Sequence, residues 1–165
     1  MNPSVLAGSI HIVGLGSGDE NKLTLGVWKR IRDAKKLILR TERHPVAAFI
    51  KQEGIPYETF DGLYESNETF EATYAAIVET LIARAKAGEH IVYAVPGHPM
   101  VAEATVRGLV QARGEQGLAV TVEGGESFLD ETFLRLGFDP IEGFQLLDAA
   151  DLRPEHIRPD IHTVI

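Results

Sequence analysis

Residues 9–19 read SIHIVGLGSGD, a short apolar run that leads directly into glycines. The β-branched side chains at the start of this stretch are typical of a buried strand in a parallel sheet. Gly14, Gly16 and Gly18 follow, and Asp19 closes the turn. Because glycine has no Cβ, the chain can turn sharply here and a ligand can lie against bare backbone. The stretch therefore predicts a ligand crevice at the carboxyl end of a first strand.

The residues after the turn predict a helix. Leu23, Val27, Ile31 and Ala34 repeat at near-helical spacing, and Thr24 precedes them as a candidate N-cap. Strand, glycine turn and helix together are the usual opening of an α/β protein.

Two other interpretations of the turn stay open at this point. The dinucleotide fingerprint G-x-G-x-x-G requires glycine at position 19, where Asp19 stands. Glu42, at the end of the next apolar run, could imitate the acid that binds a ribose hydroxyl. A tight turn with no ligand would also explain the glycines.

Composition limits the classes of function. A chain of 165 residues, 44% hydrophobic, can hold one sizeable core, or one core and part of another. Its net charge of −8 argues against nucleic acid as the main partner, because phosphate binding needs a basic face. It has no cysteine, and its histidines lack metal-ligand spacing, so we expect no disulfide and no metal site.

The sequence also predicts where the protein acts. No apolar run approaches the roughly 20 residues of a membrane span. The first residues, MNPSVLAGS, lack the basic region of a signal peptide. We therefore expect a cytoplasmic protein with no membrane partner.

Strands alternate with helices along the rest of the chain, which predicts an α/β fold with a mostly parallel five-stranded sheet and helices on both faces. The aromatic residues Phe70 and Tyr74 follow the apolar period of a long helix, and we expect them in the core. Later strands are expected at 37–39, 57–60, 90–95 and 118–122. Helices are expected from His44 to Gly54, over 68–86, from Val101 to about 114–117 and over 128–136, with a polar loop at 61–67.

Three of the five strands end in loops rich in glycine or proline. The first is the turn after Val13; the others are 96–99, reading PGHP, and 124–127, reading GGES. In an open parallel sheet such loops lie at one edge, where ligands bind. A tight connection would explain any one of them, but three together favour a binding site.

The pattern changes after Phe138. Residues 139–143 suggest a linker, and short apolar runs at 144–147 and 162–165 suggest strands. We expect a first α/β domain over 1–140 and the beginning of a second over 141–165, which we interpret as truncated. Unpaired strand edges there favour packing against a second copy of the chain.

These stretches together resemble the tetrapyrrole (corrin/porphyrin) methylase family of S-adenosylmethionine-dependent enzymes. The resemblance is closer still to the methylase-type domain that precedes a MazG-type nucleotide pyrophosphohydrolase. It is carried by HIVGLGSGDENKLTLGVWKRI, VYAVPGHPMVAEATV, VEGGESFLDETFLRLGFDP and GFQLLDA, which stand in the family's order. It implies two α/β domains with the cofactor between them, a small-molecule acceptor (tetrapyrrole or other) and a homodimer.

The resemblance also implies which residues bind S-adenosylmethionine. The family's second motif, commonly G-D-P, falls on 97–99, and its third, P-G-x-[ST], falls on 124–127. His98 replaces the usual acid and Gly124 the usual proline, so His98 could instead be an ordinary loop histidine. The cofactor-binding residues implied are Gly14, Gly16, Ser17, Gly18, Asp19, Pro96, Gly97, His98, Pro99, Val101, Ser127 and Phe128.

The chemistry agrees with this implied function. Methyl transfer from a sulfonium is an in-line displacement whose leaving group belongs to the cofactor, so the protein mainly positions two reactants. We therefore name no catalytic residue. The alternative is a non-catalytic module that binds a nucleoside-containing ligand and regulates a pyrophosphohydrolase. The acidic helices of the MazG-type half are missing from the sequence, so we do not expect nucleotide hydrolysis by this chain.

Overall fold

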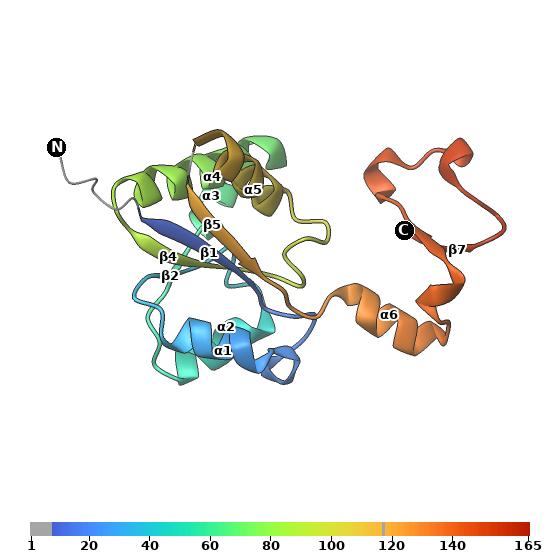
Figure 1. Cartoon of the computed structure of the whole chain (residues 1–165), viewed down its shortest axis with the longest axis horizontal. Helices are drawn as coiled ribbons and strands as arrows, with labels where there is room; N and C mark the ends of the chain where they lie inside the picture. Colours follow the sequence, from blue (N-terminus) through green and yellow to red (C-terminus); the bar gives the residue numbers. More distant parts are fainter. Residues whose placement is uncertain (1–7, 117) are drawn as a thin grey trace. The chain divides into compact units, whose positions relative to one another are not determined.

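The computed structural model describes residues 8–116 and 118–165, and the chain divides into two compact units, 1–128 and 129–165 (Figure 1). Residues 1–7, which belong to the N-terminal stretch that lacks the basic region of a signal peptide, lie outside the described residues. Gly117, near which a helix was expected to end, does so too. The predicted domain boundary after residue 140 stays a prediction.

A five-stranded parallel sheet forms the centre of the first unit, with strand order β3-β2-β4-β1-β5. The predicted fold class is confirmed. The three inner strands, β2, β4 and β1, are largely buried, because both of their faces carry apolar side chains. The strands are β1 (Ser9–Gly14), β2 (Leu37–Leu39), β3 (Glu58–Thr59), β4 (His90–Val95) and β5 (Ala119–Glu123).

Helices cover both faces of this sheet, as the labels in Figure 1 show. One core cluster joins Val13 of the sheet to Val27 and Ile31 of a helix; the other joins Ile12 to Ile77. Successive residues of β1 thus enter opposite cores, as the pleat of a strand requires. The helices are α1 (Leu25–Arg32) and α2 (Pro45–Gln52) on one face, and α3 (Asp61–Ser66), α4 (Phe70–Lys86) and α5 (Ala104–Gln116) on the other.

Local signals in the sequence explain where these helices begin and end. The Thr24 hydroxyl accepts a hydrogen bond from the Val27 amide, so the predicted N-cap of α1 is confirmed. Pro45 occupies the first turn of α2, where its missing N–H costs nothing. Gly54 follows that helix with φ = 71°, a left-handed conformation that favours glycine.

Two predictions about the chain around the start of α4 are wrong. The expected polar loop at 61–67 is mostly the helix α3, whose Leu63 carbonyl accepts hydrogen bonds from Asn67. Phe70 is 65% exposed instead of buried in the core. It stands in the first turn of α4, where its ring stacks on Tyr74 and meets Tyr64. The helical period placed Phe70 on the apolar face, but nothing in the described residues covers that end of the helix.

The second unit is small. Its predicted strands are present as β6 (Phe144–Leu146) and β7 (His162–Val164), and they pair with each other in parallel, so the last strand has a partner within the chain. The Phe138 ring lies between Phe144 and His162, with ring centroids 6.2 and 4.3 Å away. The remaining elements are α6 (Phe128–Leu136), which begins at the end of the first unit, and the 3₁₀ turns η2 (Pro140–Glu142), η3 (Ala149–Asp151) and η4 (Pro154–His156).

None of the helices in the described residues has the length and apolar content needed to cross a membrane.

Candidate functional site

The loops after β1 and β4 meet at the carboxyl edge of the sheet. Gly97 N–H donates to Gly16 O at 2.9 Å, and Gly16 N–H returns a longer bond to Gly97 O at 3.3 Å. Leu15 N–H donates to Val95 O at 2.8 Å. The two glycine loops are thus joined backbone to backbone, and Gly16 and Gly97 both have positive φ, at 81° and 63°.

The loop after β5 packs against the same point. A Cβ placed on Gly14 would lie 2.4 Å from Gly97 O and 2.9 Å from Gly125 N. Side chains add a second link, because Lys22 Nζ donates to Glu126 Oε1 at 3.0 Å. The predicted convergence of three loops at one edge of the sheet is therefore confirmed.

The first two of these loops border a cavity of about 360 Å³, and Phe128, directly after the third loop, also lines it. Seven of the residues that the resemblance implied line it: Gly16, Ser17, Pro96, Gly97, His98, Val101 and Phe128.

The other five implied residues do not line this cavity. Gly14 and Pro99 pack the loops together, since a Cβ on Gly14 would lie 2.7 Å from Pro99 Cδ. Gly18 packs against Lys22, and Asp19 accepts a hydrogen bond from the Asn21 amide and caps η1 (Glu20–Lys22). Ser127 is buried.

Four residues that line the cavity were not predicted as binding residues from the sequence: Arg40, His44, Ala102 and Glu103. Arg40 directly follows β2. The predicted binding loops follow β1, β4 and β5, and none was predicted after this strand. Glu103 is an isolated acid in the apolar stretch MVAEATV, which was the signal available in the sequence, and the structure buries it. Ala102 precedes it with φ = 54°, in the left-handed region that alanine rarely adopts.

Arg40 and Glu103 form a partly buried ion pair inside the cavity. Arg40 Nη1 donates to Glu103 Oε1 at 2.6 Å, and the Glu103 side chain is only 4% exposed. Burial raises the pKa of Glu103, and Arg40 opposes that rise only in part. Burial lowers the pKa of Arg40, but the carboxylate and nearby tyrosines outweigh this, so its pKa lies above the ordinary value.

Two residues that line this cavity each have a buried polar atom without a hydrogen-bond partner. Ser17 Oγ and Arg40 Nε are both buried and have no hydrogen-bond partner among the described residues. Leaving a buried donor unpaired costs about 1–3 kcal/mol. The left-handed backbone at Ala102 adds a cost of about 1–3 kcal/mol. Unpaired donors and strained backbone collect at functional sites, so these costs mark the cavity as one.

His44 closes one side of the cavity and is held as a neutral imidazole. Its Nδ1 accepts the Val46 amide at 3.3 Å, so Nε2 carries the proton and donates to Gly16 O at 3.2 Å. Burial lowers its pKa below the ordinary 6.5, although the bond to Gly16 opposes this. His44 thus couples the start of α2 to the first glycine loop.

We predict that His44 makes folding stability depend on pH. Its folded pKa is lowered, so the unfolded chain takes up the proton first as the pH falls below 6.5. The free energy of unfolding should therefore be fully retained above pH 6.5 and decline as the pH falls through the folded pKa. His44→Asn keeps a capping acceptor and should flatten this decline. Urea unfolding at several pH values measures both proteins, and equal pH dependence would contradict the assignment.

The two departures from the family's motifs touch each other. A Cβ on Gly124 would lie 2.9 Å from His98 Nε2, so the imidazole occupies space that a proline at position 124 would need. His98 Nδ1 accepts the Met100 amide at 3.1 Å, which holds the ring within its own loop. His98 is therefore both a hydrogen-bonded loop histidine and a lining residue of the cavity.

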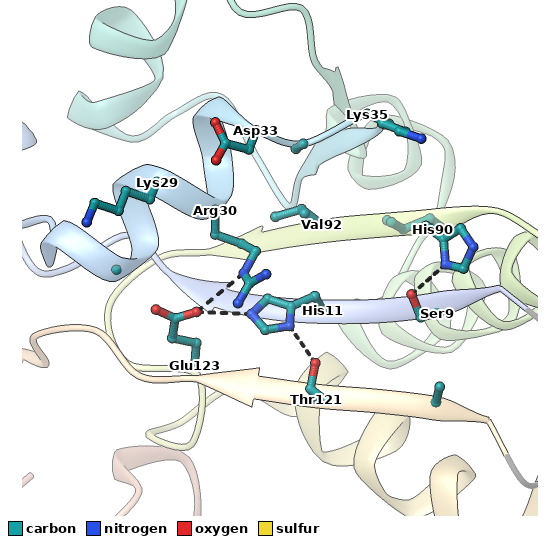
Figure 2. A pocket seen from close by; sticks show the side chains of 14 residues that line it. Ser9, His11, Lys29, Arg30, Asp33, Lys35, His90, Val92, Thr121 and Glu123 are labelled. Atoms are coloured by element: carbon teal, nitrogen blue, oxygen red, sulfur yellow. Dashed lines mark hydrogen bonds and ion pairs between the residues drawn. The ribbon is translucent and has the colours of Figure 1, made fainter.

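A second, larger hollow of about 630 Å³ lies beside α1, over β1 and β5 (Figure 2). It shares no lining residue with the loop cavity. His11 lies 2.5 Å from Thr121 Oγ1 through Nδ1 and 3.1 Å from Glu123 Oε2 through Nε2, and Arg30 approaches that carboxylate at 3.6 Å. Among the described residues, none that lines this hollow has a buried polar atom without a partner, in contrast to the loop cavity.

Comparison with known proteins agrees with this fold. A family model described as "Tetrapyrrole (Corrin/Porphyrin) Methylases" matches residues 9–163. The chain belongs to the tetrapyrrole methylase family. A relative among the curated proteins is the uncharacterized protein YabN of Bacillus subtilis (strain 168), 43% identical over 160 residues. That match covers 97% of this chain and 32% of YabN.

Another relative carries an activity in its name. The methyltransferase and type I borosin cyclic peptide precursor mroMa1 of Mycena rosella is 28% identical over 163 residues, which cover 96% of this chain and 41% of that protein. The chain thus spans less than half the length of these two relatives.

Solved structures of the tetrapyrrole methylase fold superpose on the chain. Diphthine synthase matches with a TM-score of 0.65 and 19% identity, over 84% of this chain and 53% of its own. Uroporphyrin-III-C-methyltransferase from Thermus thermophilus matches with a TM-score of 0.62 and 23% identity, over 85% and 60%. At these identities the superpositions establish the fold.

Proposed function

We propose that this chain is an S-adenosylmethionine-dependent methyltransferase domain that binds its cofactor in the cavity bordered by the loops after β1 and β4. The observation that carries the proposal is the convergence of the loops on a cavity with unpaired buried donors, in a chain of the methylase family. The methyl acceptor is a small molecule, tetrapyrrole or other, and is unassigned.

The residues present fit the cofactor. The paired backbones of Gly16 and Gly97 offer an edge without side chains, against which an adenosine can lie. The Ser17 hydroxyl is buried without a partner and suits a ribose or methionyl oxygen. Val101 and Phe128 give the cavity apolar walls. When bound, S-adenosylmethionine would supply an activated methyl group and its own leaving group.

The role of the protein in such a reaction is positioning. The loops are fixed to one another by backbone hydrogen bonds and by the Lys22–Glu126 ion pair, so a ligand would meet a preformed surface. Holding two reactants in line can supply several kcal/mol toward the barrier. No proton transfer by a side chain is required for this role.

A dinucleotide is a poorer match to the geometry. Asp19 is engaged in capping η1. Glu42 accepts a hydrogen bond from the Tyr57 hydroxyl at 3.3 Å and does not line the cavity, so neither residue serves as the fingerprint requires.

The setting of the domain is part of the proposal. We place it in a cytoplasmic homodimer, ahead of a MazG-type nucleotide pyrophosphohydrolase in the natural protein, on the resemblance of its motif stretches. Nucleic acid and membranes are not among its partners, and the net charge of −8 supports the first of these exclusions.

Calorimetry on the full-length natural protein tests the proposal. S-adenosylmethionine and S-adenosylhomocysteine should bind with one site per chain, and NAD should not bind. Binding of NAD without either sulfur nucleoside would overturn the proposal in favour of the dinucleotide interpretation. Nucleoside binding without methyl transfer to tetrapyrrole or peptide acceptors would favour the non-catalytic module.

A further inference from the structure

We infer that Arg40, with Ser17, forms a carboxylate-binding subsite inside the loop cavity. The inference rests on the proposed function, because the carboxylate would belong either to the methionyl group of the cofactor or to the methyl acceptor.

The guanidinium of Arg40 is fixed but only partly used. Its backbone N–H donates to Ala94 O at 2.9 Å, which holds the residue against β4 at the mouth of the cavity. Nη1 donates to Glu103, and that bond sets the orientation of the guanidinium. Nε, on another edge of the same planar group, is buried without a partner. A fixed arginine with an unused N–H is prepared for an additional acceptor.

The surroundings of this N–H select the ligand. Ser17 lines the same cavity, and its Oγ, the other buried unpaired atom, can also donate a hydrogen bond. Two donors in one cavity call for an acceptor oxygen, and a guanidinium binds carboxylates with particular strength because of its charge and fork geometry. Glu103 is the carboxylate that lines the cavity, and it is already bonded to Arg40, so the additional acceptor comes from a ligand.

Glu103 acts as a positioning residue in this arrangement. Its side chain is nearly inaccessible, and it follows the strained backbone of Ala102, so its place at the start of α5 is set by the fold. A buried ion pair adds little net stability, and its retention in a cavity is better explained by the orientation it gives to Arg40.

The test compares nucleosides with and without a carboxylate on the full-length natural protein. The variant is Arg40→Gln combined with Glu103→Gln, which removes both charges together and avoids leaving one buried charge unpaired. The probes are S-adenosylhomocysteine and 5′-methylthioadenosine, which lacks the methionyl carboxylate. Arg30→Gln, whose ion pair lies in the other hollow, is the matched control.

If the cofactor supplies the carboxylate, the double variant should bind S-adenosylhomocysteine about 30-fold more weakly, as loss of a charged hydrogen bond requires. Its affinity for 5′-methylthioadenosine should stay within about threefold. If the acceptor supplies it, both nucleosides bind normally, and propionate added to protein saturated with S-adenosylhomocysteine should shift the Ser17 amide resonance in the wild type and not in the variant.

Three results separate the possible failures. Equal affinities of wild type and variant for all three probes would overturn the subsite. A wild type that binds neither nucleoside would overturn the proposed function, and propionate alone would then decide whether the subsite exists. Arg40→Lys keeps the charge without the planar fork, and it should show the same selective loss at about tenfold if the double variant fails to fold.

Discussion

Replacing Gly97 by valine is expected to lower the affinity of the full-length protein for S-adenosylhomocysteine by on the order of 100-fold. Gly97 lines the cavity, and a Cβ added there meets no atom within 4 Å, so the new side chain would project into open space. The two methyl groups would occupy volume that the ligand needs. The affinity is measured by calorimetry.

A second glycine separates this effect from backbone strain. Gly54 has φ = 71° and also has no atom within 4 Å of an added Cβ, but it stands after α2 and does not line the cavity. Both valine variants should lose about 1–3 kcal/mol of stability, since each forces a branched residue into the left-handed region. Only Gly97→Val should lose binding. Equal affinities of the two variants would contradict the position of the cavity.

Replacing Gly14 by alanine is expected to lower the free energy of unfolding by about 3 kcal/mol. The added Cβ would lie 2.4 Å from Gly97 O, 2.7 Å from Pro99 Cδ and 2.9 Å from Gly125 N. Two of these three atoms belong to backbone that cannot move aside without separating the loops. The variant should also bind S-adenosylhomocysteine more weakly, because the edge formed by Gly16 and Gly97 would be displaced. Urea denaturation gives the stability change.

Gly62→Ala is the control for this experiment. Gly62 lies in α3, its φ is not positive, and an added Cβ meets nothing within 4 Å. Alanine is the better helix former, so stability should be unchanged or raised by up to about 1 kcal/mol. If Gly14→Ala were as stable as Gly62→Ala, the contact of the three loops at Gly14 would be wrong.

The sheet and its three loops could be predicted because their signals are local. A parallel strand buried on both faces is a continuous apolar run, and a sharp turn at its end needs glycine or proline, so both are visible within about ten residues. The convergence of the loops then follows from strand direction alone. The fold class and the meeting of the loops were therefore within reach of the sequence, while seven of the lining residues were implied by the resemblance to the methylase family.

The charged part of the cavity was not within reach, because it is made by residues far apart in the chain. Arg40 and Glu103 are separated by 63 positions, and neither stands in a recognisable motif. The contact between His98 and Gly124 also depends on how two loops pack, so their departures from the family's pattern looked independent. Phe70 shows a different limit of the sequence. Helical periodicity predicts which face of a helix is apolar, but it does not show whether other residues cover that face.

Amide chemical shifts of the full-length natural protein, labelled with ¹⁵N and titrated with S-adenosylhomocysteine, test the central claim most directly. We predict that the largest shifts in the first unit fall on Gly16, Ser17 and Gly97, while the strand residues of the other hollow, Ser9 and Thr121, change little. Binding that shifts Ser9 and Thr121 and leaves the glycine loops unchanged would contradict it.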